Sequence, residues 1–149
     1  MPRQSSAICC LILAVWFVPV LAQRPEEAAK GLQGSWTATM AERDGKVADD
    51  VVGHRLSFTG SRFQLQSKDG KPLYAGTVRV DPSTKPAAID FEHTDGDLKG
   101  KAWKGIYVLN GDTLTICDNA PNLDKGRPAS FEAKSGSGYV LITFARAKP

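Results

Sequence analysis

From Trp36 onward, apolar and polar residues alternate along the chain with a period of two. Short alternating runs separated by turn residues are typical of consecutive antiparallel β-strands. Successive side chains of a strand point to opposite sides, so each run would present one apolar face. The pattern predicts apolar faces made of Trp36, Ala38 and Met40, of Leu56 and Phe58, of Phe63 and Leu65, of Tyr74, Val78 and Val80, of Ile89 and Phe91, of Leu114 and Ile116, and of Val140, Ile142 and Phe144.

Glycine-containing turns separate these runs, and Asn110-Gly111 is the strongest hairpin signal because both positions tolerate positive φ. About eight strands joined mostly by short hairpins predict an all-β, up-and-down antiparallel meander. Closure into a barrel would remove the exposed edges of such a sheet. From Trp103 to Leu109 apolar residues occur at both odd and even positions, so the pattern does not show which side of this strand faces the core. The other turns are Thr59-Gly60-Ser61, Asp69-Gly70 and Asp95-Gly96.

One helix is predicted, from Pro25 to Leu32. Pro25 suits the first helical turn, Glu26 and Glu27 favour its positive end, and Gly34 ends it. Such a short helix would act as a lid, with Leu32 against the barrel floor. The interval from Asp44 to His54 is interpreted as the longest irregular stretch and as a loop at the barrel mouth.

Before the strands, the chain begins with the layout of a secretory signal. Arg3 precedes an uncharged apolar run from Ala7 to Ala22, and Val20 and Ala22 are the small residues before a cleavage site. The run is shorter than the roughly twenty residues that span a bilayer as a helix, which disfavours a retained anchor. We therefore expect a signal peptide over residues 1–22 and a single exported domain over 23–149, periplasmic or secreted, without an integral membrane segment.

Charge and cysteine content narrow the function classes. The formal net charge is +3, and interleaved acids and bases at this weak excess argue against nucleic acid as a partner. Two of the three cysteines, Cys9 and Cys10, lie in the predicted signal, so Cys117 alone remains and no internal disulfide can form. An apolar core must then hold the domain. Cys117 is interpreted as a buried core thiol, with a reactive thiol as the alternative.

A short helix, then Leu32-Gln33-Gly34-Ser35-Trp36, an eight-strand pattern and a late basic residue resemble the lipocalin-like barrels. The resemblance implies that Trp36 lies at the closed end and that Arg146 packs across its ring as a cation over a π face. Later lipocalin motifs and the usual disulfides are not visible. A longer set of segments is similar to a planctomycete-type uncharacterised domain family, from which no activity carries over. The segments are Leu32 to Trp36, Asp44-Gly45-Lys46, Leu56-Ser57-Phe58-Thr59-Gly60, Lys85-Pro86-Ala87-Ala88-Ile89-Asp90, Gly105-Ile106-Tyr107, Gly111-Asp112-Thr113-Leu114 and Gly136-Ser137-Gly138.

Candidate chemistry is sparse. Asp90, Glu92, His93, Asp95 and Asp97 suggest a cation site or an acid/base pair, but Asp90 and Glu92 share a face opposite His93, so a solvated strand and turn is the competing interpretation. His54 and His93 lack partners at zinc-ligand spacing. We expect no metal, no cofactor and no enzymatic activity, since the sequence shows no nucleophile with a base. The basic cluster Lys99, Lys101 and Lys104 is either an anion-attracting surface or a solvated loop.

Four inward aromatic residues are the candidate ligand-binding set. They would either line a pocket for a small hydrophobic molecule or fill the barrel, since an eight-strand barrel is just wide enough for one or the other. The first reading predicts an exported lipocalin-like binding protein. The second predicts a solid barrel that acts as an interaction or inhibitor module for an envelope protein, through the Asp44 to His54 loop or the lysine cluster. The four residues are Phe58, Phe63, Phe91 and Tyr107.

Overall fold

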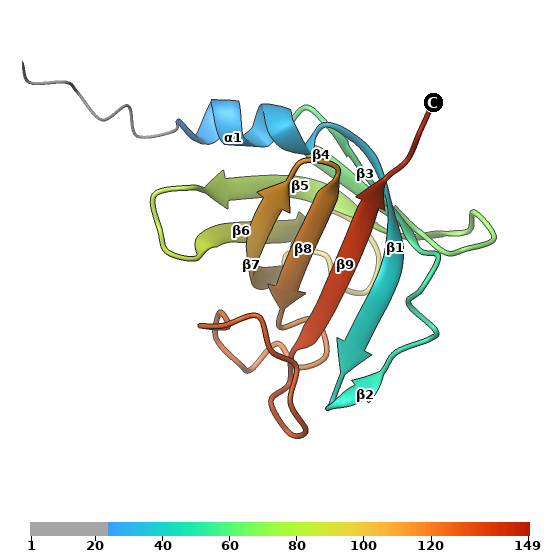
Figure 1. Ribbon diagram of the computed structural model, residues 1–149, viewed down its shortest axis with the longest axis vertical. Helices are drawn as coiled ribbons and strands as arrows, with labels where there is room; N and C mark the ends of the chain where they lie inside the picture. Colours follow the sequence, from blue (N-terminus) through green and yellow to red (C-terminus); the bar gives the residue numbers. More distant parts are fainter. Residues whose placement is uncertain (1–23) are drawn as a thin grey trace, which may run out of the picture.

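The computed structural model describes residues 24–149, so the expected signal peptide over 1–22 lies outside the described residues. One helix precedes nine strands (Figure 1). The predicted helix is confirmed with its expected bounds. The elements are α1 (Pro25–Leu32), β1 (Gly34–Arg43), β2 (Lys46–Val47), β3 (Arg55–Thr59), β4 (Arg62–Gln66), β5 (Pro72–Asp81), β6 (Ala87–His93), β7 (Ala102–Asn110), β8 (Thr113–Asp118) and β9 (Val140–Arg146).

Eight of the strands close into an antiparallel barrel, as the sequence predicts. From β3 to β9 each strand pairs with its neighbours in sequence, β1 pairs with β3, and β1 also pairs with β9 to complete the ring. The short β2 pairs only with the end of β1. The four glycine turns lie where they were expected, between β3 and β4, β4 and β5, β6 and β7, and β7 and β8. This closed barrel is consistent with a lipocalin-like fold.

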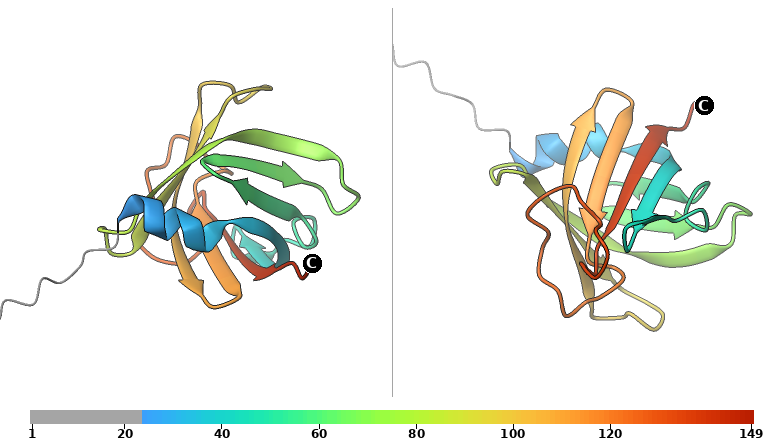
Figure 2. Two further views of the ribbon diagram at one scale, coloured as in Figure 1. Left: turned by 90° about the horizontal axis from the view of Figure 1, so that it is seen from above. Right: turned by 60° about the horizontal axis from the view of Figure 1, so that its bottom comes forward.

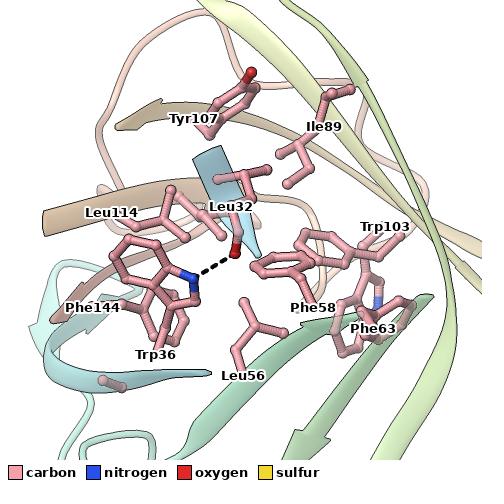
Figure 3. Packing of buried hydrophobic residues seen from close by; sticks show 14 of the residues in the cluster. Leu32, Trp36, Leu56, Phe58, Phe63, Ile89, Trp103, Tyr107, Leu114 and Phe144 are labelled. Carbon is pink, nitrogen blue, oxygen red and sulfur yellow. Dashed lines mark hydrogen bonds between the residues drawn. The ribbon is translucent and has the colours of Figure 1, made fainter. Parts of the chain in front are cut away.

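The inner face carries the predicted apolar residues, most of which form one core cluster (Figure 3). Tyr74 and Val140 are not part of this cluster, and Tyr74 is 39% exposed. One assignment was wrong: Met40 is 69% exposed, and Ala41 is buried instead. The register between β1 and β9 shifts between Ala38 and Met40, so Thr39 is an extra residue in β1. This β-bulge reverses the parity of the strand after Ala38, which the alternation in the sequence does not reveal.

Strand β7 resolves the segment that is apolar on both parities. Trp103 and Tyr107 belong to the inner cluster, whereas Ile106 is buried on the outer face. The segment 119–139 between β8 and β9 lies outside the barrel wall (Figure 2, right) and covers this face. The sequence suggested that the interval 44–54 is the longest irregular stretch, but among the described residues the segment 119–139 is longer. Both faces of β7 are apolar because both are covered.

The segment 119–139 is held to the wall by specific contacts. The guanidinium Nη1 of Arg127 donates to Asp90 Oδ1 at 2.6 Å and to the carbonyl oxygen of Gly105 at 2.7 Å. Beneath the segment, Cys117 is fully buried and its Sγ lies 3.6 Å from the carbonyl oxygen of Glu132. Burial raises the pKa of this thiol to about 11, which fits a core thiol rather than a nucleophile.

Helix α1 crosses one end of the barrel, which we call the closed end (Figure 2, left). Leu32 is 1% exposed there, and its carbonyl oxygen accepts a hydrogen bond of 2.8 Å from Trp36 Nε1 (Figure 3). The guanidinium carbon of Arg146 lies 4.2 Å from the centre of the Trp36 ring. Arg146 also donates to the carbonyl oxygens of Gln33 and Gly31, at 2.9 and 3.0 Å. The two residues implied by the lipocalin resemblance thus meet beneath the helix.

Candidate functional site

The opposite end of the barrel contains a pocket of about 340 Å³, which we call the mouth pocket. At this end of the barrel β1, β4 and β8 finish, and β5, β7 and β9 start. Val51 and His54 of the β1–β3 connection also line it, so the interval 44–54 contributes to the mouth as expected. Its walls are mostly apolar and aromatic: Leu65, Tyr74, Trp103, Val140, Ile142 and Phe144.

Asp118 lines this pocket as the last residue of β8. Leu114 and Ile116 precede it at spacings of two, so the same alternation that buries those side chains turns the carboxyl group into the barrel. In the neighbouring strand Gly105 pairs with Asp118. A Cβ at Gly105 would lie 2.9 Å from the Cβ of Asp118, so the glycine leaves room for the acidic side chain.

The carboxyl group of Asp118 is buried with little compensation. The residue is 5% exposed, and Oδ1 accepts one hydrogen bond of 2.9 Å from the backbone N–H of Ala120. Within residues 24–149 no salt bridge reaches it. Burial raises the pKa of Asp118 to about 7, and the Ala120 hydrogen bond opposes that rise only in part. Near neutral pH this carboxyl group is therefore poised between its charged and neutral forms.

The pocket rim carries a second acid, but that one is paired. Arg43 donates from Nη2 to Asp50 Oδ1 at 2.9 Å and from Nη1 to Oδ2 at 3.2 Å. The hydrogen bond from Arg43 is the main cause that lowers the pKa of Asp50, so Asp50 is ionised at neutral pH. The two opposite charges lie in a forked geometry that satisfies each partner. Arg43 is thus engaged at the rim and not with Asp118.

Two aromatic residues of the pocket wall, Tyr74 and Trp103, pack against each other and against His93. The ring centres of Tyr74 and Trp103 are 4.9 Å apart, and His93 lies 4.3 Å from Trp103 and 5.5 Å from Tyr74, all edge to face. Both ring nitrogens of His93 and Nε1 of Trp103 are buried without a hydrogen-bond partner in the described part of the chain. Burial lowers the pKa of His93, so its ring is neutral at pH 7. Buried polar atoms are normally hydrogen-bonded. Of these two residues, Trp103 lines the mouth pocket and His93 does not.

The four aromatic residues proposed from the sequence lie away from the mouth pocket, and Tyr107 lines a separate pocket of about 370 Å³ beside Ala28 and Gly31 of α1. All are buried, and Phe91 contacts two of them: its ring centre is 5.0 Å from that of Phe63 and 6.2 Å from that of Phe58. None of the four is among the residues that line the mouth pocket. Their role in ligand binding stays a prediction. The barrel is filled by side chains in its middle and hollow at its mouth.

Sequence analysis missed Asp118, Tyr74 and Trp103 as site residues. A signal for Asp118 was present, because it continues the period of two set by Leu114 and Ile116 and so places an acid on an apolar face. The intervening Cys117 points outward, under the covering segment.

The acidic cluster around His93 is not a joint site. Asp90 binds Arg127 outside the wall, and His93 faces inward. Asp95 and Asp97 lie in the exposed β6–β7 turn. Over residues 24–149 there is no group of three or more His, Cys, Asp or Glu side chains placed to hold a metal ion. None of the described helices is long and apolar enough to cross a membrane.

No protein-family model and no solved structure matches the chain. Among curated proteins, it is similar to the progesterone receptor of Hylobates lar, with 28% identity over 151 residues that cover 95% of this chain and 14% of the receptor. It is also similar to the progesterone receptor of Pongo pygmaeus, with 32% identity over 114 residues that cover 68% of this chain and 12% of the receptor. The chain thus spans a small fraction of each receptor, and this likeness shows no shared family.

Proposed function

We propose that the protein is an exported, lipocalin-like binding domain that holds a small, largely apolar molecule in the mouth pocket. The observation that carries the proposal is the pocket itself, which has a volume of about 340 Å³ and is walled by apolar and aromatic side chains. One of them, Trp103, has an Nε1 without a hydrogen-bond partner among the described residues. Small-molecule sites have this composition, and their volumes begin at roughly 300 Å³. The activity is reversible binding without a chemical step.

Native mass spectrometry of the protein purified from its own host tests this function. We expect a fixed mass excess that disappears on denaturation. A single form at the mass of the polypeptide alone, in protein that still binds no small apolar probe, would contradict the proposal.

A pair of variants on β9 locates the binding. Ile142 lines the pocket, and the adjacent Leu141 is partly exposed on the outer face of the same strand. Ile142→Trp should fill the pocket and abolish the mass excess, whereas Leu141→Trp should retain it. Retention of the mass excess in Ile142→Trp would place the ligand elsewhere, and its loss in both variants would show that the effect does not come from filling the pocket.

Export is part of the same proposal and has its own test. Cleavage after Ala22 should give a mature protein whose first residue is Gln23. N-terminal sequencing of the protein recovered outside the cytoplasm measures this directly. A protein that retains Met1 and stays in the cytoplasm would refute export without bearing on the pocket.

The alternative function, an interaction module for an envelope protein, has one supporting observation. Met40 and Val47, on β1 and β2, are 69% and 74% exposed, which is high for apolar side chains of a folded domain. If this surface binds a protein, pull-down from envelope extract should recover a partner with the native protein and lose it with Met40→Glu. Recovery that is the same with both proteins would count against this alternative.

A further inference from the structure

The charges that face the mouth pocket leave one group uncompensated. Arg43, Asp50, His54, Tyr74 and Asp118 are the titratable residues in its lining. Arg43 and Asp50 neutralise one another through two hydrogen bonds. Asp118 is the remaining acid, and within residues 24–149 it has no cationic partner. When its carboxyl group is ionised, the pocket therefore carries a local negative charge in a region of low polarity.

The surroundings of Asp118 suit an organic cation better than an anion or a neutral molecule. An anion would meet the repulsion of Asp118, and the guanidinium that could bind it is already engaged by Asp50. A neutral molecule would leave the buried carboxylate without a counter-charge, which is costly. Tyr74 and Trp103 line the same pocket as Asp118. The faces of aromatic rings attract cations, and their area binds apolar groups.

We propose that the mouth pocket binds a small protonated amine with an apolar body, whose ammonium group pairs with Asp118 and whose body packs against Tyr74 and Trp103. This inference rests on the proposed function, because it specifies the chemical class of the molecule that the pocket holds. His93, behind the two rings, is neutral at pH 7 and does not oppose a cation.

Three probes with the same aromatic body and different head groups test the inference: 2-phenylethylamine, 2-phenylethanol and phenylacetate. Titration calorimetry at pH 8, on protein freed of bound molecules by dialysis, measures their affinities. We expect the amine to bind at least about tenfold more tightly than the alcohol, and phenylacetate to bind more weakly than either. Equal or tighter binding of the alcohol overturns the inference, and this comparison needs no variant that could fail to fold.

Asp118→Asn removes the charge and keeps the size of the side chain. In this variant the preference for the amine over the alcohol should fall to less than about threefold. Asp97→Asn is the matched control, because Asp97 is exposed beside Leu98 at the mouth and loses the same charge. It should retain the preference. A preference that survives in Asp118→Asn overturns the assignment of the ammonium group to Asp118.

The pH dependence of binding is an independent readout. The amine needs ionised Asp118, so its affinity should rise between pH 5 and pH 8, while that of the alcohol should change less. Arg43, Asp50, His54 and Tyr74 also line the pocket, and His93 packs against Tyr74 and Trp103. Any contribution from these groups would persist in Asp118→Asn. A slope that is the same in this variant and in the native protein refutes the role of Asp118.

The outcomes separate the two proposals. If all three probes bind with similar affinity, the apolar pocket stands and the amine site is refuted. If none of them binds and the host protein carries no mass excess, both proposals are refuted.

Discussion

At the scale of single residues, Asp118 stands out because its burial does not contribute to the stability of the fold. Its carboxyl group is buried among apolar neighbours and accepts one backbone hydrogen bond. A buried charge without a partner destabilises a fold, and such positions occur most often at functional sites. The proposed site is therefore built on Asp118 rather than on the four aromatic residues that the sequence suggested.

Asp118→Asn should stabilise the protein at alkaline pH. The pKa of Asp118 is about 7 in the folded chain, above its ordinary value of 3.8, so the folded state binds more protons than the unfolded state between these values. Stability falls as pH rises through this window. We expect the variant to exceed the native protein by roughly 2 to 4 kcal/mol at pH 8 and by almost nothing at pH 4. Urea unfolding at both pH values measures this, and a constant difference would contradict it.

Trp36 supports the closed end by packing and by its hydrogen bond to Leu32. Its ring is fully buried, so Trp36→Ala should lower the free energy of unfolding by roughly 3 to 5 kcal/mol. Asp97→Ala, in an exposed turn, should change it by less than about 0.5 kcal/mol. Denaturant melts of the two variants measure these effects, and equal losses would show that Trp36 does not secure the closed end.

At the scale of elements, the segment 119–139 acts as a second layer over β7 and β8. It buries Ile106 and Cys117 on the outer face of the wall. The sequence did not predict this layer, because Pro, Asn and Gly residues in the segment signal turns but not where those turns pack. The bulge in β1 was missed for a similar reason: a register shift depends on the neighbouring β9 and not on the composition of β1.

Cys117 can serve as a reporter of this layer. In the native protein its thiol should react slowly with a disulfide reagent at pH 8, because it is covered and its pKa is about 11. Arg127→Ala removes the contacts to Asp90 and Gly105, and it should speed labelling by about tenfold through local opening, the equivalent of one lost hydrogen bond.

Lys134→Ala is the control for this experiment. It breaks an exposed ion pair with Glu132 in the same segment, and exposed pairs contribute little. Its labelling rate should match that of the native protein. A rate in Arg127→Ala no faster than in this control would show that Arg127 does not hold the layer in place.

At the scale of the whole molecule, the barrel is the feature that sequence predicts best. The period of two and the glycine turns come from local chemistry, and the meander they specify has few ways to close. The closed end followed from the resemblance carried by Trp36 and Arg146. The mouth pocket did not, since it depends on which inward side chains remain small or short at one level, such as Gly105 opposite Asp118.

Closure of β1 on β9 predicts that the barrel unfolds as one cooperative unit. Trp103→Phe leaves Trp36 as the sole tryptophan of residues 23–149, so fluorescence then reports the closed end alone. Its midpoint in urea should coincide with that of the β-sheet signal in circular dichroism. Separate midpoints would show that the closed end unfolds independently of the strands.

The barrel wall has two layers at β7 and β8 and one layer at β4 and β5, so the two sides should differ in how easily they deform. Where β7 and β8 are backed by the segment 119–139, displacement of the wall would disrupt two packed interfaces, whereas the outer faces of β4 and β5 carry solvent-exposed residues such as Arg62 and Arg79. A guest larger than the resting hollow should therefore push the β4–β5 hairpin outward and leave the doubled side stationary. In the proposed binding function, Asp118 on the covered side would select the head group of the ligand, and movement of β4 and β5 would accommodate ligands of different size.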